Sequence, residues 1–172
     1  MVVAGAAIGV AFAAAGAGGA SLWPDAAVPL AAALGGVALV YALHELDFVR
    51  LPVPGRDWQV PVEWVSGGFY RSAVIFGGTV GFGVFTRVPY ASFPILLAWL
   101  FVSGNVAYGL AAGLVYGVAR AISIYSSARC GQPEEVISVG QRFMSWAPAL
   151  HTVTGFALTT FAAYLLTALA LS

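Results

Sequence analysis

The chain has 172 residues, of which 60% are hydrophobic and 8% are charged, and its mean hydropathy is +0.91. A soluble domain carries about 25% charged and about 45–50% apolar residues, so this composition excludes one and indicates a protein surrounded by lipid. The seven acidic residues balance the seven basic residues, so the chain has no net field that would attract nucleic acid.

The first two charge-free tracts predict a pair of membrane helices, because about 20 residues of helix cross about 30 Å of hydrocarbon. Residues 2–22 end at Trp23-Pro24-Asp25, where an interfacial Trp, a helix stop and a helix-starting acid coincide. Residues 26–43 then return as a second helix in a tight hairpin. A cleaved signal peptide is the alternative for the first tract, but no Arg or Lys precedes it and it is long for a signal peptide.

A polar stretch at residues 44–71 follows, and its three prolines predict a surface loop. Residues 72–86 form a third apolar segment, which as a helix is only roughly 22 Å long. The charge-free tract between Arg87 and Arg120 would be roughly 48 Å long as one straight helix, so it must turn. The predicted turn is Ser103-Gly104-Asn105.

That turn divides the tract into two short helices, residues 89–102 and 106–119. A second polar loop is expected at residues 120–142, and the last apolar tract, residues 143–172, contains a span that begins at Pro148. The sequence therefore predicts an all-α, polytopic transmembrane bundle with six apolar segments. We interpret residues 1–172 as a single integral membrane domain, since the chain shows no internal repeat or low-complexity linker.

The arginines leave two topologies open. Six crossings divide the seven arginines three against four, which decides nothing. Five crossings, with one net crossing in residues 72–102 and a break near Arg87 and Pro89, place six arginines on one face, which would be cytoplasmic. We favour six segments and leave the orientation open.

Three glycines predict close helix packing. Gly109, Gly113 and Gly117 recur every four residues and place bare backbone along one ridge of a helix, where another helix can approach closely in lipid. The same spacing occurs at Gly5 and Gly9 in the first segment. We expect these rows to pack inside one bundle; the alternatives are a homodimer interface and a passage for substrate.

The second helix ends with residues that could carry chemistry. Tyr41 and Glu45 share one helix face, and His44 lies three residues after Tyr41. The other histidine is His151, which lies near the same membrane face as His44 only with five crossings. We expect neither histidine to bind a metal, and Cys130, the single cysteine, cannot form a Cys-ligated site alone.

No nucleophile elbow, phosphate-binding glycine loop or zinc motif is present. The sequence therefore disfavours an enzyme and predicts no cofactor. Because every basic residue is arginine and Ala, Gly and Val are abundant, as in GC-rich bacterial genomes, we expect a multi-pass protein of a bacterial plasma membrane.

The stretch 77–97, with Gly77, Gly78, Gly81 and Gly83 before Pro89 and Pro94, resembles the broken first helix of CcdA- and DsbD-type membrane domains, which pass electrons across a membrane. In that family a glycine-rich half-helix leads into Pro-Cys-x-x-Pro. The resemblance implies a related bundle with a helix broken at Pro89. It does not imply a thiol relay, because no cysteine lies between these prolines.

Two functions follow. A helix broken at Pro89 exposes backbone groups that lipid does not tolerate unless protein or a watery cavity receives them, so we favour a transport-related or electron-transfer-related component with a substrate site at Arg87, Pro89 and Asn105. Asn105 could also cap the helix that follows it. The alternative is a non-catalytic subunit or assembly factor. The expected partners are the lipid bilayer and another membrane protein or a second copy.

Overall fold

The structure, a computed structural model, describes residues 1–52, 74–75, 78, 90–128 and 132–171. Within these ranges all regular structure is helical, as the composition predicts. The polar stretch after residue 52 and the third apolar segment, 72–86, lie almost entirely outside the described residues. Arg87, Pro89 and Cys130 lie outside them as well.

The first two helices confirm the sequence prediction closely. Helix α1 spans Val2–Leu22, the 3-10 turn η1 spans Pro24–Ala26, and α2 spans Ala27–Glu45. Helix α2 ends in a Schellman-type cap: Phe48 N–H donates to Leu43 O at 2.9 Å and Asp47 N–H to His44 O at 3.1 Å. Asp47 takes the left-handed backbone conformation of that cap (φ 62°).

Helices α5 (Ser92–Ser103) and α6 (Val106–Ala128) are joined at the predicted turn. Gly104 has φ 58°, a conformation that favours glycine, and its N–H donates to Leu100 O at 3.1 Å. The side chain of Asn105 then caps α6, because its Oδ1 accepts the N–H groups of Ala107 (3.0 Å) and Tyr108 (3.2 Å).

The polar loop expected at residues 120–142 is wrong. Helix α6 continues through Arg120 to Ala128, and α7 already begins at Pro133 and runs to Ala170. Proline suits the first turn of a helix, and a helix satisfies its own backbone on either side of a membrane boundary. With 38 residues, α7 is roughly 57 Å long, much longer than the hydrocarbon.

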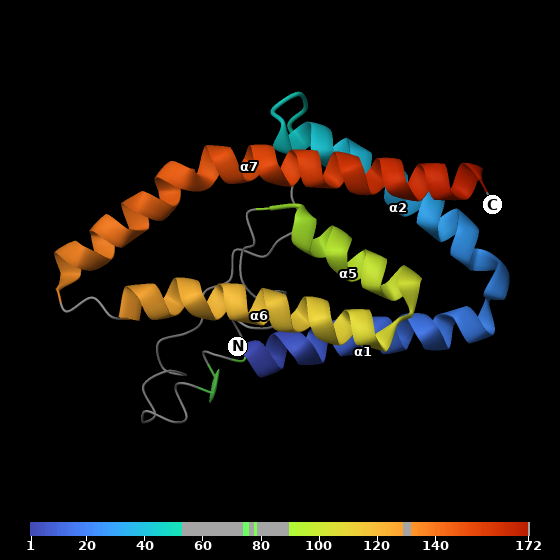
Figure 1. The fold of residues 1–172 in the computed structure, drawn as a ribbon, viewed down its shortest axis with the longest axis horizontal. Helices are drawn as coiled ribbons and strands as arrows, with labels where there is room; N and C mark the ends of the chain where they lie inside the picture. The colour runs from blue at the N-terminus through green and yellow to red at the C-terminus, as the bar shows by residue number, and fades with distance from the viewer. Residues whose placement is uncertain (53–73, 76–77, 79–89, 129–131, 172) are drawn as a thin grey trace.

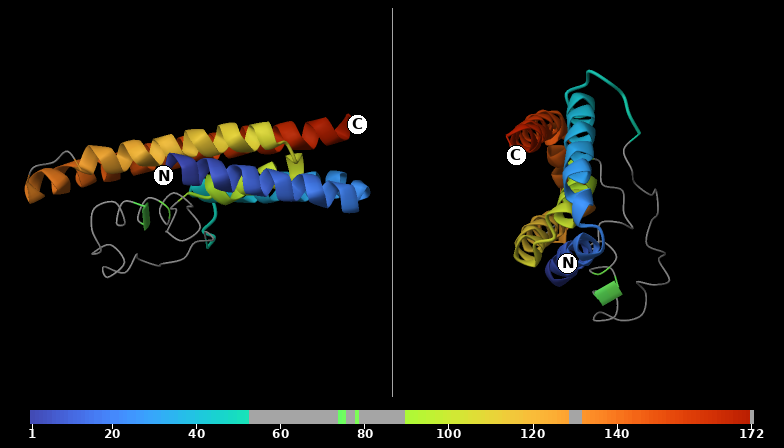
Figure 2. Two further views of the ribbon diagram at one scale, coloured as in Figure 1. Left: turned by 90° about the horizontal axis from the view of Figure 1, so that it is seen from below. Right: turned by 90° about the vertical axis from the view of Figure 1, so that its right-hand side faces the viewer.

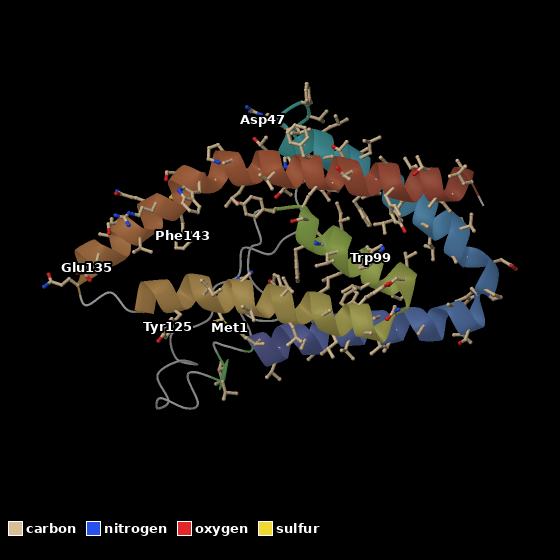
Figure 3. The ribbon with its side chains drawn as sticks, in the orientation of Figure 1. Met1, Asp47, Trp99, Tyr125, Glu135 and Phe143 are labelled. Atoms are coloured by element: carbon tan, nitrogen blue, oxygen red, sulfur yellow. The ribbon has the colours of Figure 1, made fainter. Side chains whose placement is uncertain are left out.

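Helix α7 bends midway (Figure 1). Pro148 lies inside it and has no N–H to donate to the carbonyl of Met144, which is a usual cause of such a bend. The carbonyl of Pro148 itself accepts the Thr152 hydroxyl at 3.0 Å. The bend separates an apolar C-terminal half from a more polar N-terminal half, on which Glu135 and Phe143 are labelled in Figure 3.

The helices pair across long sequence separations. Helix α1 packs along α6, and α2 packs along α7. Helix α5 lies between the two pairs (Figure 1), and the helix axes are roughly aligned, with the partners in each pair antiparallel (Figures 1 and 2). The predicted tight hairpin of α1 and α2 is therefore wrong beyond its turn, because the two helices diverge from η1 to meet different partners. Helix α5 contributes to two apolar cores, one with α2 and α7 and one with α1.

Helices α1 and α6 meet backbone to backbone along a row of glycines that we call the glycine seam: Gly5, Gly9, Gly109, Gly113 and Gly117. A Cβ on Gly5 would lie 2.5 Å from the Gly113 carbonyl oxygen, and one on Gly117 would lie 2.7 Å from Val2 Cα. A Cβ on Gly9 would overlap the carbonyl of Gly109. In this arrangement the seam lies inside the chain, between two of its own helices.

The described residues do not support six crossings. Three helical stretches are long and apolar enough to cross a membrane: α1, Pro24–Glu45, and Ile137–Ala170 within α7. Helix α5 has 12 residues and is roughly 18 Å long, and the apolar part of α6 is Val106–Ile122. Helix α5 and the apolar part of α6 are therefore shorter than the roughly 20 apolar residues that each crossing of a simple six-crossing bundle requires.

Replacing Gly9 by Leu should destabilise the protein by about 1–3 kcal/mol or more, because the side chain would push α1 off α6. Gly18→Leu on the same helix is the matched control, since a Cβ there meets nothing within 4 Å. Thermal unfolding of the two purified variants in detergent measures the difference. Equal melting temperatures would contradict the seam.

Candidate functional site

Glu45 is the last residue of α2. Among the residues that the structure describes, it is the one charged residue that is buried, with 4% of its surface exposed. Its Oε1 accepts the backbone N–H of Ala91 at 2.7 Å, just before α5 begins. Its Oε2 bonds Nδ1 of His151 on α7. One carboxylate thus joins three helical elements, and both of its oxygens have partners, as burial of a charge requires.

His151 is held beside Glu45 by the close approach of α2 and α7. At Gly155, one turn after His151, a Cβ would lie 2.6 Å from Cγ of Leu46, so the missing side chain lets the end of α2 lie on α7. The histidine ring also packs against the ring of Tyr90, with 4.8 Å between centroids. The side chain of His151 is still 38% exposed.

Tyr90 completes this cluster. Burial, followed by the negative charge of Glu45, raises the pKa of the Tyr90 hydroxyl above its ordinary value of 10.0. The phenol therefore stays protonated and remains a hydrogen-bond donor beside the pair.

His44 has a different role from its neighbour Glu45. Its Nδ1 accepts the backbone N–H of Leu51 at 3.1 Å, and Tyr41 donates its hydroxyl to Pro52 O at 3.1 Å. These two side chains fold the segment after α2 back against the helix. His44 and Tyr41 thus stabilise the local structure after α2, whereas Glu45 connects α2 to two other helices.

A cavity of about 810 Å³ lies between the end of α2 and α7. His44, Glu45 and Asp47 line it from one side, and Pro148 and His151 line it from the other. Both histidines thus line one cavity. Such proximity requires that they lie near the same face of the membrane, as in the five-crossing topology. Within the described residues no group of three or more His, Cys, Asp or Glu side chains could hold a metal ion.

The residues proposed for the substrate site do not meet in this cluster. Arg87 and Pro89 lie outside the described residues, and Asn105 caps α6 at the opposite end of α5 from Ala91. Sequence reasoning missed the pairing of Glu45 with His151. A usable signal existed: His151 is the one acid, base or histidine in residues 148–172, and ionisable groups inside membrane segments generally pair with one another.

These features define a helical membrane protein whose two antiparallel helix pairs are joined by a short central helix and a buried Glu–His pair. No protein-family model and no solved structure matches the chain.

The chain is similar to proteins named methylamine utilization protein MauF. It is 30% identical to that of Methylophilus methylotrophus over 151 residues, which are 84% of this chain and 51% of the relative. It is 34% identical to that of Paracoccus denitrificans over 106 residues (55% and 35%) and 32% identical to that of Paracoccus versutus over 95 residues (51% and 32%). The chain thus spans about a third to a half of these relatives.

These similarities correct the resemblance to CcdA- and DsbD-type domains, because the matching proteins carry a different name and the match extends far beyond residues 77–97. Glycines and prolines are common in membrane helices. A pattern of these residues without the cysteines therefore did not discriminate between families.

Replacing Glu45 by Ala should destabilise the protein by about 1–3 kcal/mol, since the Ala91 N–H would stay buried without an acceptor. His151→Ala should destabilise it as well, and the double variant should lose less than the sum of the single variants because the two residues act on each other. Asp25→Ala, at an exposed acid, is the control. Thermal unfolding of the four variants in detergent tests this, and strict additivity would contradict the pair.

Proposed function

We propose that the chain is a non-catalytic component of a membrane assembly that serves methylamine utilization, as a subunit or an assembly factor, and that it is a multi-pass protein of a bacterial plasma membrane. The observation that carries the proposal is the similarity to methylamine utilization proteins, which for one of them extends over 84% of the chain. The activity belongs to the assembly, and this chain supplies a binding surface in the membrane.

The N-terminal half of α7 supports this role. Exposed apolar side chains occupy about half of its circumference, a broad face that we call the α7 stripe; its members are Ile137 (61% exposed), Phe143 (45%), Met144 (77%) and Trp146 (66%). Glu135, Ser138 and Gln141 lie on the other side of the helix by their spacing. An exposed apolar patch beside polar residues marks a surface that contacts another protein or the membrane, and we favour a protein because Trp, Phe and Met are enriched in protein interfaces.

The glycine seam is excluded as the surface that binds a partner protein. The backbone of α6 at Gly109 and Gly113 is already covered by α1, so the same ridge cannot also receive a partner. We therefore assign partner binding to the α7 stripe, and we name another membrane protein as its partner.

The transport-related or electron-transfer-related site at Arg87, Pro89 and Asn105 stays a prediction. Its first two residues lie outside the described chain, and the helix cap made by Asn105 accounts for that side chain.

Deleting the gene from its host should abolish growth on methylamine and leave growth on succinate unchanged, because the assembly would lack a component that methylamine utilization alone requires. A plasmid copy of the wild-type gene should restore growth. Growth curves on the two substrates measure this, and a deletion strain that grows normally on methylamine would refute the proposal.

In that deletion strain, a gene carrying Phe143→Ser and Trp146→Ser should fail to restore growth on methylamine, although the protein accumulates in the membrane at the wild-type level. Tyr164→Ser, at a residue of α7 that is also 66% exposed but belongs to the apolar half, should restore growth fully. Immunoblots of membrane fractions give the protein level. Full growth of the double variant would show that the stripe binds no essential partner.

A further inference from the structure

An apolar cavity of about 390 Å³ lies between α5, α6 and α7, and none of the roles above uses it. Six side chains form most of its wall: Phe93, Leu96, Trp99, Tyr116, Leu158 and Phe161. Its volume falls within the range of about 300–1,000 Å³ that is typical of ligand pockets. Figure 3 shows Trp99 on α5, in the middle of the structure.

The two ends of the cavity differ in polarity. At the start of α5 it is lined by Tyr90 and Ser92, and there the rings of Phe93 and Tyr116 stack with 4.3 Å between centroids. Two turns further along α5 the lining is Trp99, whose ring meets that of Phe161 edge to face. The cavity is therefore apolar along its depth, and Tyr90 and Ser92, which carry hydroxyl groups, lie at one end of it.

A cation stands at the polar end. Arg120 lies one turn after Tyr116 on α6, on the side away from Trp99, and its Nη1 donates to the Tyr116 hydroxyl at 3.0 Å. The guanidinium carbon lies 5.7 Å from the centre of the Tyr116 ring. The tyrosine thus links the wall of the cavity to the guanidinium of Arg120.

We propose that this cavity binds one acyl chain of an anionic phospholipid, with the phosphate of the headgroup at Arg120. Water does not fill an apolar cavity of this kind, and walls without neighbouring atoms lose their dispersion contacts. The surrounding solvent is lipid, whose chains supply those contacts. A guanidinium binds phosphate through paired, charge-assisted hydrogen bonds, so the charge selects an anionic lipid over a neutral one.

Native mass spectrometry of the full chain in detergent, titrated with dioleoylphosphatidylglycerol or dioleoylphosphatidylcholine, tests the proposal. The wild-type chain should retain one phosphatidylglycerol, with a preference of about tenfold over phosphatidylcholine. Ala157→Phe, which places a ring in the cavity wall, should reduce phosphatidylglycerol binding about tenfold. Ala163→Phe, on an exposed face of the same helix, should leave it unchanged.

Arg120→Gln should bind the two lipids equally, whereas Arg142→Gln, at an exposed arginine of α7, should keep the preference. Melting temperatures of all four variants show whether each remains folded; should Arg120→Gln unfold, Arg120→Lys, which keeps the charge, must retain the preference. Undiminished binding by Ala157→Phe, or equal binding of the two lipids by the wild-type chain, would overturn the proposal. So would a neutral isoprenoid quinone that displaces the phospholipid from the wild-type chain.

Discussion

A buried carboxylate cannot stay charged in a low-dielectric interior without partners, and at Glu45 this constraint fixes how the end of α2, the start of α5 and the middle of α7 meet. The partners come from α7 and from the backbone that starts α5. Helix α5 therefore begins at a fixed place relative to the α2–α7 pair. Because α5 also packs against α1, it fixes the position of the α1–α6 pair relative to the α2–α7 pair. The two helix pairs are coupled through a helix of only 12 residues.

The two pairs are held together by different means. Helices α1 and α6 approach through glycines, so their contact is backbone on backbone and tolerates almost no added atom. Helices α2 and α7 meet through larger apolar side chains such as Leu34 and Leu158, with one polar pair at the end. Only the second pair borders the cavity that contains both histidines, and only its helix α7 extends into the stripe assigned to a partner.

Local signals in the sequence predicted local structure well. The helices end at both predicted turns, Trp23-Pro24-Asp25 and Ser103-Gly104-Asn105. A proline and a glycine in the left-handed conformation affect only the few residues around them, so their effect can be predicted locally. The prediction of a loop at residues 120–142 was wrong because arginines indicate where the chain passes from lipid to water, but they do not end a helix. The Glu45–His151 pair spans 106 positions, and periodicity within one helix cannot choose a partner in another; only the rule that buried charges pair pointed toward it.

The order in which the chain is made has a consequence for the glycine seam. Helix α1 is synthesised before α6, and the surface that covers its glycines lies about a hundred residues later in α6, so synthesis at about 5–20 residues per second leaves that face without its partner for about 5–20 seconds. During this interval α5 can already pack against α1, but the glycines that face α6 still lack their partner helix. Biogenesis of this protein therefore depends on protecting a bare helix face until its distant complement enters the bilayer.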